Sequence, residues 1–324
     1  MPRQNCTRRH GRVASRLVLL ALGLLPAFAG AQQRVLRING DDVRKHADGV
    51  LALMSYSVVP DLTTSSLSIT NASTGNPNLS MTQFAGGFTI SQSSPLYLEG
   101  GIAASRYDPT FVASDGTETD AIPTKWNCLA GSLGVGWDFP IAPELKFRPI
   151  ANFALGRVSS DAAIAANVFG NRHDRDLQFL DGGRLDAVGY GASAMLDYEH
   201  YRPDYEVDVE LRLTAIHLES YGGTADLVKG SADSQTLNLW SRYRAPTGLT
   251  IFQRPFRYVL EFAHSEFFGD QRGALGFERL SSFGAGIEFD SSAYPIIITR
   301  TRFVLRYVVG DNVSGASLGI AVSF

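Results

Sequence analysis

The chain has 324 residues, with 29 basic and 32 acidic side chains and a net charge of −3. This small negative charge argues against a protein that binds polyanions such as nucleic acids. The chain has two cysteines, Cys6 and Cys128, which are too few for a thiolate zinc cluster. Only Cys128 lies beyond the leader described next, so we expect no disulfide within the mature chain.

Residues 1–31 have the features of a secretory signal peptide. Five arginines and no acidic residue precede or flank the apolar run Leu17–Leu25, which is followed by the small-residue site Ala29–Ala31. The run is too short to span a bilayer as a helix. A twin-arginine signal at Arg8-Arg9 is the weaker alternative, because the usual apolar residues do not follow the pair. We expect cleavage after Ala31, which lowers the net charge to −8.

The next segment, 32–61, is predicted to hold a short helix within 41–56. The helical stripe consists of Val43, Ala47, Val50, Leu51 and Met54. One interpretation is a plug inside the pore of a barrel. The alternatives are a peripheral periplasmic helix or a further β segment that continues through Val59.

From residue 62 to residue 324, apolar and polar side chains alternate with the period of a β-strand. About twelve segments of roughly ten residues show this pattern. They lie near 62–70, 79–90, 96–107, 128–139, 145–157, 187–199, 205–218, 235–244, 256–266, 279–290, 300–309 and 315–324. Strands of this length exceed those of ordinary soluble sheets. The sequence therefore predicts an all-β protein, a transmembrane antiparallel β-barrel over 62–324, with a soluble β-sandwich as the alternative.

The connections between these strands alternate in length, as in outer-membrane barrels. The short ones are 92–94, 140–144 and 200–204, and the long ones are 108–127, 158–186 and 218–234. Two connections fit less well, because 245–255 is too long for a turn and 310–314 is short for an outer loop. An even number of strands predicts that both ends of the chain lie in the periplasm.

The final strand, Ala316–Phe324, alternates and ends on the aromatic Phe324. This ending resembles the C-terminal signature that the barrel assembly machinery reads in outer-membrane proteins. Together with Arg302–Tyr307 and the turn Gly310–Asn312, it is similar to an autotransporter translocator barrel. More narrowly, it resembles the solitary outer membrane autotransporter-like β-barrel domain family.

The resemblance implies a place in the outer membrane of a Gram-negative cell, in contact with membrane lipid and lipopolysaccharide, and a helix inside the pore. Unlike ordinary autotransporters, this chain has only about thirty residues between Ala31 and the first predicted strand, too few for a passenger domain. A porin-like or adhesion-type barrel is the competing resemblance. We expect a monomer, with Phe324 as the assembly signal.

The polar faces of the predicted strands carry charges of both signs. The candidate lumen-lining residues are Arg148, Glu206, Asp208, Glu210, Arg212, Arg257, Glu261, Arg302 and Arg306. Mixed charges either pair as salt bridges that narrow the pore or line a weakly selective channel. Arg302 and Arg306 face small residues of the last strand, which leaves them room to reach inward.

No catalytic, cofactor-binding or metal-binding motif is evident. His173, in the charged stretch Asn171–Asp176 of the longest loop, is the one histidine considered for catalysis, but no nucleophile elbow accompanies it. The acidic spacing around it does not fit an EF-hand. The sequence thus favours a non-enzyme, either a narrow or plugged pore of the autotransporter-translocator type or a structural or surface-interaction (adhesin-like) barrel that acts through its extracellular loops.

Overall fold

The computed structural model describes most of the chain from Arg37 to Ser323. The described residues are 37–38, 43–59, 66–70, 78–91, 93–108, 110–114, 119–123, 126–160, 184–221, 230–251, 254–290, 300–311 and 313–323. The predicted signal peptide, His173 and Phe324 lie outside these ranges. Within them, no helix is long and apolar enough to cross a membrane.

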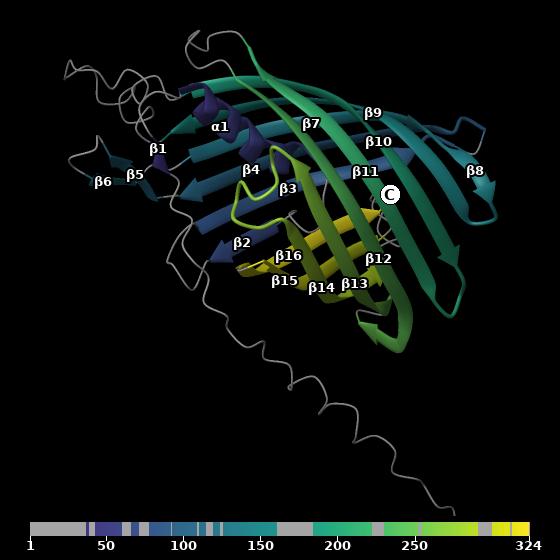
Figure 1. Ribbon diagram of the computed structural model, residues 1–324. Coiled ribbons are helices and arrows are strands. Elements are labelled where there is room, and N and C mark those ends of the chain that lie inside the picture. The colour runs from purple at the N-terminus through teal and green to yellow at the C-terminus, as the bar shows by residue number, and fades with distance from the viewer. Residues whose placement is uncertain are drawn as a thin grey trace, which may run out of the picture. The chain divides into compact units, whose positions relative to one another are not determined.

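Within the described residues, twelve antiparallel strands pair in chain order, and the last strand pairs with the first (Figure 1). They are β2 (Ser66–Thr70), β3 (Asn78–Thr89), β4 (Leu96–Asp108), β7 (Trp126–Trp137), β9 (Leu145–Ser160), β10 (Arg184–Tyr201), β11 (Glu206–Ser220), β12 (Ser231–Ile251), β13 (Arg254–Gly269), β14 (Arg279–Asp290), β15 (Arg300–Gly310) and β16 (Val313–Ser323). The pairing of β16 with β2 joins Ser314–Ala316 to Ser68–Thr70. The sheet therefore closes on itself as a barrel, and the predicted twelve-stranded fold is confirmed.

The barrel has an apolar outer face and a polar or small-residue inner face. Along β15, Leu305 is 66% exposed whereas its neighbour Arg306 is 6% exposed. The same alternation exposes large apolar side chains around the ring, among them Phe84, Ile102, Leu133, Phe153, Phe283 and Ile320. So much exposed apolar surface is unfavourable in water and suits lipid. The chain is a transmembrane β-barrel.

A row of aromatic rings crosses four neighbouring strands at the end of the barrel that carries the short turns. Tyr198, His200, Tyr205, Tyr243 and Tyr258 stack or tilt against one another in that order, with ring centroids 5.3–6.3 Å apart. Rings of this kind concentrate at the membrane–water interface. The row therefore marks one edge of the lipid-facing band.

Short strands in the described ranges lie beside the ring. β8 (Phe139–Ala142) pairs with β9 after the turn end of β7. β5 (Thr110–Ser114) and β6 (Thr119–Pro123) form a hairpin within the connection from β4 to β7, and β1 (Arg37–Ile38) pairs with β5 in parallel. The alternation in the sequence did not predict these strands.

Strands β12 and β13 also continue through most of 245–255, which the sequence suggested was a connection. The register shifts between Pro246 and Thr250, and Gly248 adopts a positive φ of 74° within that shift. A proline tolerated at an irregular position of this kind does not interrupt the strand. Both strands therefore extend beyond the predicted ends at 244 and 256.

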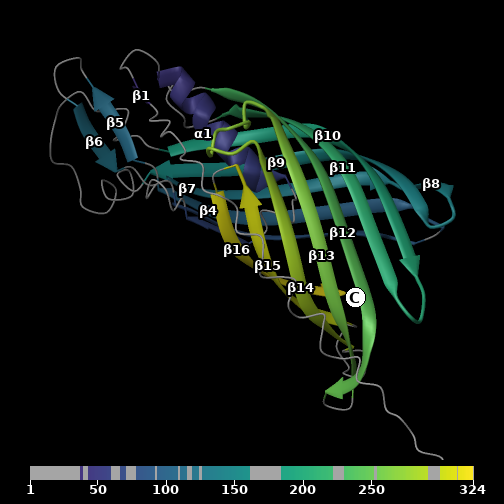
Figure 2. The same cartoon turned by 60° about the horizontal axis from the view of Figure 1, so that its bottom comes forward.

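The helix α1 (Val43–Val58) packs inside the ring near the ends of the strands that carry the long connections (Figure 2). It is continuous through Val58, so the alternative of a β segment there is wrong. From Val50 to Val59 every side chain is buried except that of Leu53, which is partly exposed. A helix buried on all sides needs surrounding structure on all sides, and the barrel wall provides it.

Candidate functional site

The interior of the barrel is the candidate site, and its half nearest the long connections is filled by α1. The helix packs against apolar inward-facing side chains of five consecutive strands, β7 and β9–β12. They are Trp126, Ala130, Ala154, Val158, Leu185, Ala187, Ile216, Leu218 and Ala232. On β9, Gly156 makes room for the helix, because a Cβ atom there would overlap the sulfur of Met54.

The C-terminal part of α1 is tied to the barrel by Gln271, which belongs to the connection between β13 and β14 and is fully buried. Its amide nitrogen donates to the carbonyl oxygen of Gln235 (2.6 Å) and to the hydroxyl of Thr236 (2.7 Å). Its side-chain oxygen accepts a hydrogen bond from Ser55 (2.8 Å), and its backbone carbonyl accepts one from the Tyr56 hydroxyl (2.6 Å). Helix, loop and wall are thus joined through one residue.

The same connection, residues 270–278, closes over the helix with an apolar contact. Phe277 is buried, and its ring lies 5.6 Å from that of Tyr56 and 5.8 Å from that of Phe267, measured between centroids. At the exposed side of the loop, a hydrogen bond from Arg272 holds the pKa of Glu278 below its usual range. The loop is therefore folded inward, with its charged residues left outside.

The other half of the interior, toward the short turns, is filled by charged side chains. Arg148 on β9 pairs with Asp138 and, at 2.9 Å, with Asp197 on β10. Lys146 lies 2.5 Å from Glu199. Except for Lys146 and Glu199, which are partly exposed, these side chains are buried. Buried charges require such partners, because an unpaired charge is costly away from water.

A second ion pair spans the interior between strands that are not neighbours. Arg212 on β11 forms two hydrogen bonds to Glu99 on β4, at 2.8 and 2.7 Å, and both side chains are buried. Asn152 donates to the same carboxylate at 2.9 Å, and Ser193 accepts a hydrogen bond from Arg212 at 2.9 Å. These four side chains are joined by hydrogen bonds and form a polar layer across the barrel.

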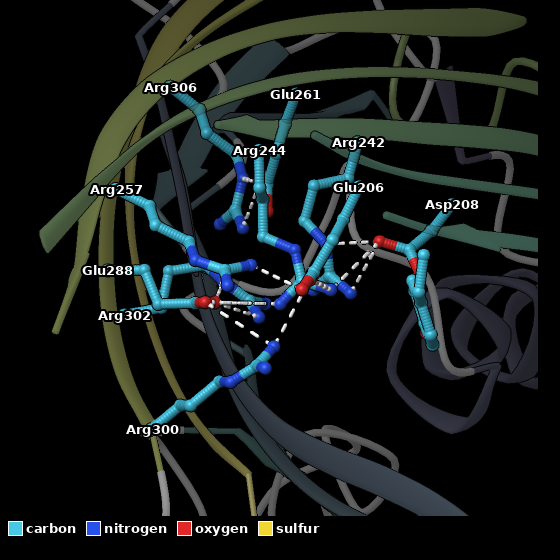
Figure 3. Close-up of polar contacts among 11 residues, drawn as sticks. Glu206, Asp208, Arg242, Arg244, Arg257, Glu261, Glu288, Arg300, Arg302 and Arg306 are labelled. Carbon is cyan, nitrogen blue, oxygen red and sulfur yellow. Dashed lines mark hydrogen bonds and ion pairs between the residues drawn. The ribbon is translucent and has the colours of Figure 1, made fainter. Parts of the chain in front are cut away.

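A third cluster centres on two buried carboxylates, Glu206 and Glu288 (Figure 3). Arg244 reaches both, at 2.6 and 2.9 Å, and Arg300 lies 3.1 Å from Glu206 and 3.8 Å from Glu288. Arg257 also pairs with Glu206. Five consecutive strands, β11 to β15, contribute to this cluster, so its ion pairs cross-link the strands on that side of the barrel.

The cluster extends at its edges. Arg302 on β15 pairs with Glu288 at 2.7 Å, and Asp208 on β11 accepts hydrogen bonds from Arg242 (2.8 Å) and Tyr201 (2.7 Å). Further along β15 toward the helix, Arg306 pairs with Glu261 at 2.6 Å (Figure 3).

Eight of the nine proposed lumen-lining residues thus take part in interior ion pairs. The ninth, Glu210, is half-buried and lies directly opposite Asp197 in the register of β10 and β11. The network also contains residues outside those nine, including Asp138, Arg244 and Arg300. These three lie at predicted strand ends and share the parity of the inward-facing residues of their strands, so the alternation extended to the strand ends would have found them.

Solved structures with similar folds include autotransporter barrels. The transport unit of the autotransporter AIDA-I from Escherichia coli aligns with 15% identity and a TM-score of 0.44, over 87% of this chain and 99% of that one. The β-domain of the Bordetella autotransporter BrkA gives 14% and 0.42, over 76% and 92%. The translocator domain of NalP from Neisseria meningitidis gives 10% and 0.40, over 76% and 82%.

The chain is similar to autotransporter translocator barrels. These TM-scores lie below 0.5, so the fold assignment made above depends on strand pairing and on the two faces of the barrel. No protein-family model matches the chain, and no curated protein matches it significantly. Over the described residues, no group of three or more histidine, cysteine or acidic side chains is arranged to hold a metal ion.

Proposed function

We propose that this chain is an integral outer-membrane β-barrel of the autotransporter-translocator type whose pore is plugged. The observation that carries the proposal is the burial, within the ring of strands, of the α1 side chains from Val50 to Val58, all except the partly exposed Leu53. An apolar helix packed against five strands would obstruct that half of the barrel.

The charged half of the interior supports the same proposal. Glu99 and Arg212 connect β4 with β11 although three strands separate them in the ring, so their ion pair crosses the interior. Glu206 and Arg300 connect β11 with β15 in the same way. Cross-links of this kind narrow a pore, which favours the salt-bridge interpretation of the inward charges over an open selective channel.

The first test measures conductance. Deleting residues 37–56 removes most of α1 and is expected to raise the single-channel conductance of the purified barrel in a planar bilayer. Unchanged conductance in a barrel that still migrates as folded would refute the plug. Because the deletion also removes apolar contacts, folding is checked by the heat-dependent shift in gel mobility.

A second variant keeps the helix and locks it in place. The Cys128 thiol on β7 lies close to Ser57 on α1, and Cys128 is the sole cysteine beyond the predicted signal peptide. Ser57→Cys is expected to form a disulfide with Cys128 on oxidation, giving a barrel with low conductance in both redox states. The Cys128→Ser, Ser57→Cys double variant is the matched control and should show no cross-link.

Orientation is part of the proposal. Long connections on the outside and short turns in the periplasm leave the end of β16 in the periplasm. The pairing of β1 with β5 favours an N-terminal segment at the opposite, outer side, which reverses the periplasmic N-terminus expected from strand number alone. Lipid and lipopolysaccharide contact the outer face, and Phe324 remains the proposed signal for the assembly machinery of a monomeric barrel.

One observation favours the second candidate function, a surface-interaction barrel. The connection from β4 to β7 contains its own hairpin, β5–β6, extended by β1 into a three-stranded sheet. An ordered sheet at the outer surface is a better platform for a ligand than an unstructured loop. Loss of surface binding after removal of 110–123, with conductance unchanged, would favour this function.

A further inference from the structure

The inner wall formed by β12 to β15, which we call the basic arc, is rich in arginine. Its described inward-facing arginines are Arg242, Arg244, Arg257, Arg300, Arg302 and Arg306. Among the residues whose side chains the structure describes, these six arginines share four carboxylates in their ion pairs, those of Glu206, Asp208, Glu261 and Glu288.

At one place on the basic arc, two buried polar groups have no partner among the described residues. They are the Nη1 atom of Arg306 and the hydroxyl of Ser317, and the two residues are 6% and 3% exposed. The Nε and Nη2 atoms of Arg306 both donate to one oxygen of Glu261, at 2.9 and 2.6 Å. Nη1 therefore remains available to donate to another acceptor.

The two unpartnered groups are neighbours in the sheet. Arg306 and Ser317 are register partners on β15 and β16. Two residues beyond Ser317, Gly319 lies under the guanidinium group, because a Cβ atom there would overlap Nη1. The missing side chain at 319 is what allows Arg306 to lie flat against β16.

The inward face of β16 becomes more exposed toward the turn end of the barrel. Along this face, Ser317 is buried, Gly319 is half-buried and Ala321 is exposed. Arg306 Nη1 and Ser317 Oγ themselves are buried. The turn end is therefore the side from which a small solute would reach them.

We propose that Arg306 Nη1 and Ser317 Oγ, above Gly319, form a binding site for a small oxyanion, either a phosphate or a carboxylate group. An arginine offers donors only, and a serine hydroxyl donates readily to a charged acceptor. An anion would satisfy both groups within the arginine-rich basic arc. The site does not depend on whether the pore conducts, so this proposal is independent of the proposal that α1 plugs the pore.

The test measures the melting temperature of the full chain in detergent during titration with inorganic phosphate. Ionic strength is held constant with a bulky sulfonate buffer, and a parallel titration uses acetate. A ligand that binds the folded state raises the melting temperature in a saturable way. A response to phosphate alone, to acetate alone or to both supports the site and identifies the class of oxyanion.

Three variants decide whether the response comes from this place. Ser317→Ala should raise the half-saturating concentration by about fivefold, the loss expected for one hydrogen bond. Gly319→Ala should abolish saturation, because its methyl group overlaps Arg306 Nη1 and displaces the guanidinium group. Gly86→Ala, with no atom within 4 Å of the added Cβ, is the control and should respond like the wild type. The proposal is overturned if the wild type shows no saturable shift, or if Ser317→Ala and Gly319→Ala both respond like the wild type.

Discussion

The ion pair between Arg212 and Glu99 connects strands that are not neighbours in the barrel. It is therefore expected to affect the stability of the barrel as well as the width of its pore. Replacing Arg212 by Met leaves the Glu99 carboxylate buried with Asn152 as its remaining close side-chain amide donor. Removing one partner of a buried pair costs about 3–5 kcal/mol, because the other charge stays uncompensated. Urea unfolding of the barrel in lipid vesicles, followed by tryptophan fluorescence, should show this loss.

The matched control is an exposed pair. Arg272 and Glu278 lie 2.6 Å apart with more than half of each side chain exposed, so Arg272→Met should leave the unfolding midpoint unchanged. Adding Glu99→Gln to Arg212→Met should restore most of the lost stability, since the buried charge is then gone. If Arg212→Met lowers the unfolding midpoint no more than Arg272→Met does, the pair between Arg212 and Glu99 does not stabilise the barrel.

At the scale of elements, the fit of α1 against β9 is tested at Gly156. In Gly156→Leu, the added side chain meets Met54, so the helix must shift away from the wall. We expect a lower yield of the cross-link between Cys128 and Ser57→Cys, together with a rise in conductance. Gly131→Leu on β7 is the control, because its Cβ points outward and the nearest atom lies 3.7 Å away.

A compensating substitution at Met54 tests the Gly156 prediction further. Met54→Ala creates space for the leucine side chain introduced on β9, so the Met54→Ala, Gly156→Leu double variant should recover the cross-link yield. A Gly156→Leu variant that cross-links as well as the wild type would mean that α1 is not held against β9.

The elements also differ in how far the sequence could predict them. Alternation identified the faces of β15, where Leu305 is exposed and Arg306 buried, because lipid and interior select opposite side chains at every second residue. It could not identify Gln271, whose partners Ser55 and Thr236 are distant in sequence. Nor could it identify the pairing of β1 with β5, since a parallel contact between two short segments leaves no periodic signal.

At the scale of the whole molecule, the topology makes a prediction about which side of the membrane each segment occupies. α1 enters the interior from the end where β5 and β6 lie, and β16 ends at the opposite end (Figure 1). With the short turns in the periplasm, the segment before α1 is expected at the cell surface. The N-terminal and C-terminal ends of the mature chain then lie on opposite sides of the membrane.

An epitope tag inserted after Ala31, just beyond the predicted cleavage site, tests this directly. Protease added to intact cells should remove the tag, because it lies outside the lipid barrier. The same tag inserted in the short turn between Tyr201 and Tyr205 should resist protease until the outer membrane is permeabilised. If both tags resist in intact cells and both are lost on permeabilisation, the N-terminal segment is periplasmic and β1 does not mark an outer position. If only the N-terminal tag is lost from intact cells, α1 passes into the barrel from the outside, so a plug that leaves the pore must leave toward the surface.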